Sequence, residues 1–403
     1  MSATATAPKP KTPSAKSASV STTPGTPKAS SVPGAKASGP QFFRLVRLWL
    51  LIVTLVCTAF GVVCVVVSES AQESSAQAAA YSQDLEDLHS TLAQAHADAL
   101  LHFAGAGTMD SYADATSQAD SLLAGLAHDS PSDAQDLVSL FTAVRQWSTQ
   151  VGVDAQSRTP NSGQASQTAY ETVDETLTRL IDATSPNRDS GLTILVLGLV
   201  GLGVGALCLL AGLILTALRS HRVINVGLAL ALLATIGSIV TVGLYSANTT
   251  AISSSDETAS RVVQASYHAW TALQQDCLSI IDPTNAASHL ELAAKEVSTA
   301  LGIVPDRDAA VYEVASQLSG LDAYNESIAS ASAGDDRRVA VSDKAVFWTD
   351  FQAIVDTTVD GIRPDPKSLV VNSVPYIVAL VACGLTGVAC VLYGVHVRAK
   401  EYL

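Results

Sequence analysis

Two long apolar runs lie close together in the middle of this chain, separated by only four residues. The runs are Gly191–Leu218 and Val223–Ser246, and the link is Arg219-Ser220-His221-Arg222. About 20 apolar residues suffice for a helix to cross a bilayer, and the backbone of such a run must be helical because lipid offers it no hydrogen-bond partner. Neither run contains Asp, Glu, Lys, Arg or His. We therefore predict a tight transmembrane hairpin, in preference to a buried hairpin of a soluble protein.

Two further apolar runs, Leu48–Val67 and Leu369–Val397, raise the number of predicted spans to four. An even number of spans places both termini on one side of the membrane. The segment before the first span is basic, and every acidic residue except Glu401 lies in the loops 69–190 and 247–368. Because cytoplasmic segments next to spans are enriched in Lys and Arg, we predict cytoplasmic termini and two extracytoplasmic loops in a multi-pass protein of the cell membrane.

The amino-terminal segment differs in composition from the rest of the chain. It consists mainly of Pro, Ser, Thr, Ala, Gly and Lys, and it cannot bury enough apolar surface to offset the entropy of ordering. The predicted division is a disordered cytoplasmic tail over 1–40, transmembrane helices over 43–68, 191–218, 223–246 and 369–397, extracytoplasmic helical bundles over 69–190 and 247–368, a cytoplasmic link over 219–222 and a cytoplasmic tail over 398–403.

Both loops have the periodicity of helices. Apolar residues recur at spacings of three and four, as in Leu85, Leu88 and Leu92, and each loop divides into four such stretches at breaks rich in Gly, Pro and Asp, among them Gly334-Asp335-Asp336. We find no sustained alternation typical of strands. Four antiparallel amphipathic helices form a bundle. The predicted fold is an all-α membrane protein with four spans, two four-helix bundles and duplicated halves.

The first helix of each loop is expected to continue the preceding span. No Pro or Gly lies between Cys64 and Phe103, and a helix over the loop part of this stretch is about 50 Å long. Pro186, Pro364 and Pro366 precede the second and fourth spans, so those junctions are expected to be less rigid. External motion could therefore pass through the first and third spans as a piston or a rotation.

Three sets of residues are candidates for interactions. The turns that geometry places farthest from the membrane are candidate partner-binding tips: Gly105, Gly107, Asp110, Pro160, Asn161, Asp282, Pro283, Asn285, Asp335 and Asp336. Small residues four apart within the spans permit close helix packing: Gly201 with Gly205, Gly237 with Thr241, and Cys383 with Gly387. Basic residues at the span ends could dock a cytoplasmic partner or bind lipid headgroups: Arg44, Arg47, Arg219, Arg222, Arg398 and Lys400.

The sequence gives little support to enzymatic or cofactor chemistry. His89, His96 and His102 are separated by neither three nor four residues, so we expect no shared helix face and interpret them as surface groups rather than metal ligands. The adjacent acids Glu86-Asp87 and Asp335-Asp336 point apart on a helix and are expected on solvated faces. We predict no catalytic residue, no cofactor and no metal, and the acidic loops argue against nucleic-acid binding.

Cys277 is the only cysteine outside the predicted spans. A lone thiol cannot close a disulfide within its loop, so it either bridges two copies of the chain or is buried as a small apolar group. We favour burial. The four spans form either one bundle or, by packing against a second copy of the chain, the bundle of a homodimer.

The layout over 43–398 resembles the extracytoplasmic four-helix sensor domains of chemoreceptors and sensor kinases. The duplicated four-span arrangement resembles the GlnX-type membrane proteins of actinobacteria. That resemblance implies a receptor that takes a signal from an amino-acid-binding lipoprotein outside and passes it to a soluble Ser/Thr kinase inside. The alternatives are a structural scaffold of a cell-envelope complex and, because the spans lack ionisable groups, with less support a transporter subunit.

Overall fold

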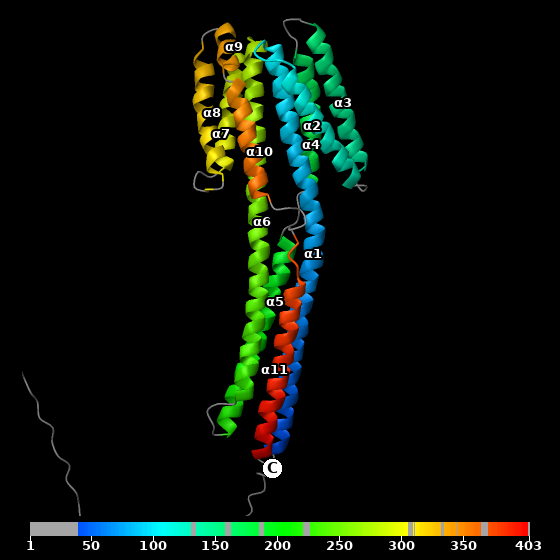
Figure 1. Cartoon of the computed structure of the whole chain (residues 1–403), viewed down its shortest axis with the longest axis vertical. Coiled ribbons are helices and arrows are strands. Elements are labelled where there is room, and N and C mark those ends of the chain that lie inside the picture. Colours follow the sequence, from blue (N-terminus) through cyan, green and yellow to red (C-terminus); the bar gives the residue numbers. More distant parts are fainter. Residues whose placement is uncertain are drawn as a thin grey trace, which may run out of the picture.

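The chain is helical throughout the part that the structure describes. The computed structural model describes residues 39–129, 134–157, 163–184, 189–220, 226–304, 309, 311–331, 334–343, 345–363 and 370–401. No strand occurs in these residues, so the all-α class is confirmed for them (Figure 1). The helices are α1 (Gly39–Phe103), α2 (Asp110–Asp129), α3 (Ala134–Ser157), α4 (Gln164–Thr184), α5 (Asp189–Ser220), α6 (Val226–Ile281), α7 (Ala286–Ile303), α8 (Tyr312–Ser330), α9 (Gly334–Ser342), α10 (Ala345–Ile362) and α11 (Val374–Glu401).

Four of these helices are long and apolar enough to cross a membrane, in agreement with the predicted number of spans. Their bounds are Arg44–Phe103, Thr193–Leu218, Val226–Ile281 and Val374–Gly394. Their apolar parts gather in one narrow bundle, which we call the stem (Figure 1). Leu55, Val200, Leu233 and Leu385 of the stem each expose more than half of their surface. Contiguous apolar surface of this kind suits lipid.

Two of the four helices extend far beyond the stem. α1 has 65 residues and α6 has 56, so they are about 98 and 84 Å long at 1.5 Å per residue. The expected continuity of span and loop helix is therefore confirmed for both. Residues 185–188 and 364–369, with the prolines expected to loosen the other two junctions, lie outside the described residues. So do residues 1–38 of the predicted disordered tail, whereas Gly39 and Pro40 already belong to α1.

Beyond the stem, α1 and α6 carry two groups of helices that we call the head. The first module, residues 83–184, packs α2 and α4 against α1, and α3 packs against α4. The second module, residues 256–363, packs α7, α9 and α10 against α6. Figure 1 shows the two modules side by side at one end of the molecule. The parts of α1 and α6 that extend beyond the stem lie between them.

The second module has one helix more than the sequence predicted. Gly334-Asp335-Asp336, interpreted above as a break, is the first turn of α9. Two acids suit this position because the helix dipole carries partial positive charge at its amino-terminal end. Arg338 lies 3.4 Å from Asp335, one turn further on.

The two modules share one hydrophobic core. Buried side chains of both modules form a single contiguous cluster that runs across α1 and α6. Trp147 is fully buried on the first side, and Trp270 is buried on the second. The sequence predicted two separate bundles; the structure instead joins them through the two long helices. The reason is that α1 and α6 each present apolar residues on two faces, one toward their own module and one toward each other.

α11 begins at Val374, five residues later than the predicted start of the fourth span. The side-chain oxygen of Asn372 accepts a hydrogen bond from the amide of Val374 at 3.1 Å, and the carbonyl of Ser373 accepts one from Ile377 at 2.9 Å. Pro375 is tolerated in the first turn, where its missing N–H has no helical partner. Asn372-Ser373-Val374-Pro375 was therefore a helix start that the apolar pattern concealed.

Small residues of α5 bring that helix close to α1. A side-chain carbon added to Gly201 would meet the Phe60 ring, and one added to Gly205 would meet the sulfur of Cys57. Two further glycines that the sequence analysis did not single out follow the same line: Gly198 faces Cys64 and Gly212 faces Leu50. Glycines at these positions allow the two helix backbones to approach each other.

α6 and α11 also pack closely. Gly237 faces the sulfur of Cys383, whereas Gly387 faces Thr54 of α1 and Ala234 of α6. The Thr241 hydroxyl donates to the carbonyl of Gly237 in its own helix at 2.9 Å. Near the far end of the stem the backbone of Gly227 meets that of Gly394 and leaves no room for a side chain between them.

Candidate functional site

The predicted partner-binding turns lie at the end of the head opposite the stem. The helix ends that flank four connections are found there: those of α1 and α2, α3 and α4, α6 and α7, and α8 and α9 (Figure 1). Gly105 adopts a φ of 72°, which glycine accommodates readily, and Asp110 begins α2. Pro160 and Asn161 lie outside the described residues. The described helix ends beside these turns thus lie at one end of the head, and the role of the turns in binding stays a prediction.

Asp282 organises the turn between α6 and α7. Its carboxylate accepts hydrogen bonds from the Asn285 side chain at 2.9 Å and from the Thr284 amide at 3.2 Å. The hydrogen bond from Asn285 is the main cause that lowers the pKa of Asp282. Asp282 therefore stays ionised on the surface of this tip, beside Pro283.

The predicted basic residues belong to helix ends at the opposite pole of the molecule. The first turns of α1 and the last turns of α5 and α11 lie at the far end of the stem (Figure 1). Arg44 is exposed there and Arg47 is half-buried. Arg222 lies outside the described residues, and only the helical backbone is described for Arg219, Arg398 and Lys400. The head tips and these basic ends are thus separated by the full length of α1 and α6.

A partly buried polar network joins the modules near the middle of the head. Nε2 of His89 on α1 lies 2.7 Å from the Asp174 carboxylate on α4, and the Tyr267 hydroxyl on α6 donates to the same oxygen at 2.7 Å. The His89 and Tyr267 rings lie 4.0 Å apart. Although burial alone would raise the pKa of Asp174, the hydrogen bond and nearby charge of His89, together with the Tyr267 hydroxyl, lower it. An ionised Asp174 therefore accepts from both modules.

His96 lies two turns further along α1 and is fully buried. Its Nε2 lies 2.7 Å from the Gln167 side-chain oxygen, while its Nδ1 accepts from the Trp147 indole at 3.2 Å. These partners require the neutral ring with its proton on Nε2. Burial lowers the pKa of His96 to about 4, against the opposing effect of Gln167. The ring also stacks on Tyr170 at 4.2 Å.

The interpretation of His89 and His96 as surface groups is wrong. A spacing of seven residues is close to two helical turns, so both side chains lie on one face of α1. That face packs against α4, which supplies the acceptors Asp174 and Gln167, and against α6, whose Tyr267 donates to Asp174. The signal that sequence reasoning missed was the heptad spacing itself, which places His89 and His96 in line with the buried leucines of α1.

Direct hydrogen bonds fix α1 against α6 along the length of the head. The Gln274 amide donates to the carbonyl of Ala93 at 2.9 Å, and the Ser90 hydroxyl donates to that of Ser266 at 3.3 Å. Closer to the stem, the Gln83 amide donates to Asp256. Because these contacts occur at successive levels, a shift of one helix along the other would break them together.

One of the two adjacent acid pairs departs from the expected solvated face. Arg363, just after α10, contacts both carboxylate oxygens of Asp87 at 2.5 and 2.9 Å, and both side chains are mostly buried. Burial raises the pKa of neighbouring Glu86. Asp335, by contrast, is almost fully exposed, as expected. The tertiary partner of Asp87 is 276 residues away, so local spacing could not reveal it.

A cavity of about 290 Å³, which we call the intermodule cavity, opens between the modules beside this ion pair. α1 and α2 form one side, and α6 and α10 form the other. Its lining residues are Asp87, Ser90, Thr91, Gln118, Leu122, Val263, Gln352, Val355, Asp356, Val359, Asp360 and Arg363. Eight of these twelve side chains are polar or charged. Sequence reasoning missed the cavity because its residues come from four separate helices.

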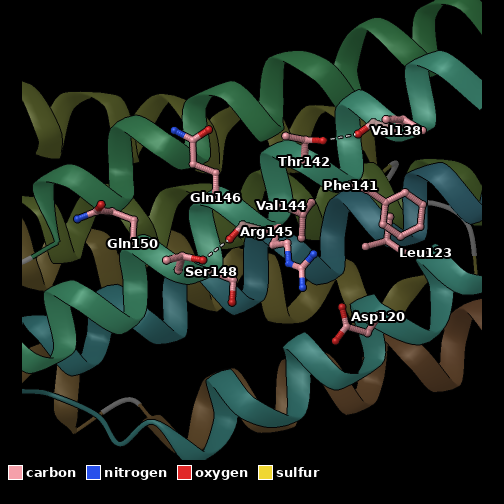
Figure 2. Close-up of a pocket in the computed structure, with 11 residues that line it drawn as sticks. Asp120, Leu123, Val138, Phe141, Thr142, Val144, Arg145, Gln146, Ser148 and Gln150 are labelled. Atoms are coloured by element: carbon pink, nitrogen blue, oxygen red, sulfur yellow. Dashed lines mark hydrogen bonds between the residues drawn. The ribbon is translucent and has the colours of Figure 1, made fainter.

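A second hollow, a groove of about 1110 Å³, lies between α2 and α3 (Figure 2). Leu123 and Phe141 lie together at one end, while Arg145 extends from α3 toward the helix that carries Asp120 (Figure 2). The groove is open because α2 packs mainly against α1 and α3 mainly against α4. It gives the first module a mixed apolar and polar surface.

Three buried titratable groups lie at the end of the head away from the stem. Cys277 is fully buried and forms no disulfide, so the favoured interpretation of this residue is confirmed. Asp276 is also fully buried, and neither of its carboxylate oxygens has a hydrogen-bond partner. Burial raises the pKa of Asp98 on α1 to about 7 and that of Asp276 well above its ordinary value. Burial without a hydrogen-bond partner therefore favours the protonated form of Asp276.

The described residues contain no group of three or more His, Cys, Asp or Glu side chains placed to hold a metal ion. The arrangement instead offers paired helices, buried polar contacts between modules and one small polar cavity. No protein-family model, curated protein or solved structure matches this chain.

Proposed function

We propose that this protein transmits a signal across the cell membrane, with the head outside and the basic stem end in the cytoplasm. The observation that carries the proposal is the continuity of α1 and α6, each unbroken from the stem to the head tips. A continuous rigid helix moves as one body, so a displacement of its head end also displaces its stem end. Two such helices in contact can shift or rotate relative to each other, as discrete rearrangements of packed helices do.

Contacts between α1 and α6 would set the resting state of this device. The Gln274–Ala93 hydrogen bond and the Ser90–Ser266 contact hold the two helices in one register within the head. A signal that favours a different register would exchange these bonds for others. The stem ends of α1 and α6 would then move relative to each other.

The proposed partners occupy the two poles. A solute-binding lipoprotein would contact the tips that include Gly107 and Asp282, and a soluble Ser/Thr kinase would dock on the basic ends that include Arg44 and Arg219.

The proposed orientation follows from the charge distribution. Protease added to intact cells is expected to cut near residues 120 and 310 and to spare the basic amino-terminal segment; the reverse pattern excludes an external head.

A disulfide lock within the head tests transmission. Ser90→Cys with Ser266→Cys joins α1 to α6 where their hydroxyls are 3.3 Å apart. We expect hydrogen–deuterium exchange of peptides covering residues 39–50 and 215–230 to differ between the oxidised and reduced full-length protein in nanodiscs. The single variant Ser90→Cys, treated with the same oxidant, is the matched control.

A lock that forms fully and leaves exchange at the stem end unchanged contradicts transmission. That result would favour the alternative role of a structural scaffold, which needs the same shared core but no coupling between the poles. Co-purification from membranes then identifies the lipoprotein and the kinase separately, because either can bind without the other.

A further inference from the structure

We infer that the intermodule cavity binds a small organic ammonium ion, a primary amine or diamine with a short carbon chain. The inference rests on the proposed function for its purpose, since it names the class of signal that the head would detect. The binding itself can be measured independently. The cavity belongs to neither module alone: Thr91 and Gln118 line it from the first, Asp356 and Asp360 from the second.

The carboxylates at the cavity favour a cationic ligand. Arg363 is already engaged by Asp87 through two contacts. Asp356 and Asp360 are exposed and lie four residues apart on α10, so their like charges are neighbours and destabilise the helix slightly. No Lys, Arg or His within the described ranges forms an ion pair with either of them. The Gln352 side-chain amide donates to one carboxylate oxygen of Asp356 at 2.7 Å. Burial raises the pKa of Asp356 most, the Gln352 hydrogen bond lowers it, and the proximity of Asp360 and Asp87 raises it further.

A buried hydroxyl supplies a second polar contact. Thr91 is only 8% exposed, it lines the cavity, and its hydroxyl has no hydrogen-bond partner among the residues that the structure describes. Neighbouring Ser90, equally buried, is committed to Ser266. Polar groups buried to this extent are normally satisfied, so an unpartnered hydroxyl facing a cavity indicates a place for a polar ligand atom.

The shape of the cavity limits the ligand to a small amine. Its volume of about 290 Å³ lies at the lower end of ligand pockets, which begin near 300 Å³. Val263, Val355 and Val359 are buried and give it an apolar floor, on which a short carbon chain can lie. An ammonium group has three donors, enough to reach Asp356 and Asp360 together. An anionic ligand would have to displace Asp87 from Arg363, at the cost of a mostly buried ion pair.

Calorimetric titration of the purified full-length protein in detergent tests this inference, with putrescine as the probe. We expect saturable binding at one site, no binding of glutarate, and at least a tenfold loss of putrescine affinity in Asp356→Asn and in Asp360→Asn. Asp350→Asn is the matched control, because Asp350 is exposed on the same helix but does not line the cavity. Thr91→Val, which keeps the side-chain shape, should weaken binding severalfold without changing the thermal unfolding midpoint.

Three outcomes overturn the inference: no saturable binding, an equal loss of affinity in Asp350→Asn, or binding of Mg²⁺ in place of the amine. These outcomes are distinct from a failure of transmission. If putrescine binds but exchange at the stem end does not respond to the disulfide lock, the cavity assignment stands and the signalling role fails. If the lock acts but no amine binds, the signalling role stands and the ligand class is wrong.

Discussion

Arg363 and Asp87 form a two-point ion pair that ties the end of α10 to the head part of α1, with contacts of 2.5 and 2.9 Å. The pair joins the last residue of the second module to the helix on which the first module is built. It also lies directly before residues 364–369, the connection to α11. A movement of one module relative to the other would therefore stretch or break this ion pair.

Arg363→Ala should destabilise the protein, because it leaves the mostly buried Asp87 carboxylate without its partner. The expected loss is about 1–3 kcal/mol, seen as a lower thermal unfolding midpoint in detergent. Arg261→Ala is the control: Arg261 pairs with Glu257 on an exposed helix surface, and such pairs contribute roughly 0–1 kcal/mol. Equal losses of stability in the two variants would contradict the prediction, because the ion pair of Arg363 would then contribute no more than an exposed pair.

His96 should make stability depend on pH in the acidic range. Its folded pKa of about 4 lies below the ordinary value of 6.5, so between these values the unfolded chain binds more protons than the folded one. Stability therefore falls as the pH drops from 6.5 toward 4 and is fully present above 6.5. In the variant His96→Gln, the thermal unfolding midpoint should fall less over this pH range than it does in the parent protein. Parallel curves for the two proteins would contradict the buried neutral ring.

Asp98 should act in the opposite direction. Its folded pKa of about 7 exceeds the ordinary value of 3.8, so its contribution to stability is fully present below pH 3.8 and is lost as the pH rises toward 7. Asp98→Asn removes this loss, and the variant should gain unfolding midpoint relative to the parent as the pH rises from 5 to 8. A constant difference across that range would mean that Asp98 is not buried as a carboxylic acid.

Gly201 should tolerate no large side chain. Gly201→Leu places atoms against the Phe60 ring, and overpacking of this kind costs about 1–3 kcal/mol. Gly203→Leu is the control on the same helix, because nothing lies within 4 Å of the added carbon there. Thermal unfolding of both variants in detergent measures the difference. A Gly203 variant as unstable as the Gly201 variant would place the α1–α5 contact elsewhere.

The sequence predicts the long elements of this fold well, for physical reasons. An apolar run longer than a bilayer is wide has few alternatives to a helix, and the absence of Pro and Gly between Cys64 and Phe103 leaves nothing to interrupt α1. The same reasoning applies to α6. Local breaks were less informative: Gly334-Asp335-Asp336 has the composition of a turn, yet it begins α9.

The contacts that form the candidate site could not be derived from one sequence. His89 meets Asp174 across 85 residues, and Tyr267 reaches the same carboxylate across 93. Helical periodicity identifies which face is apolar, but not which of two neighbouring helices that face will meet. The shared core was missed for this reason: α1 has one stripe for its own module and another for α6, and the two overlap in the sequence.

The meeting of Gly227 and Gly394 at the far end of the stem has a mechanical consequence. With no side chain between the two backbones, this crossing can serve as a pivot for α6 against α11. From Gly227 to Ile281 the helix is about 81 Å long. Each degree of tilt about that crossing displaces the far end by about 1.4 Å. A lever of this length converts an angular change too small to alter side-chain packing at its fulcrum into a movement large enough to break hydrogen bonds at its tip.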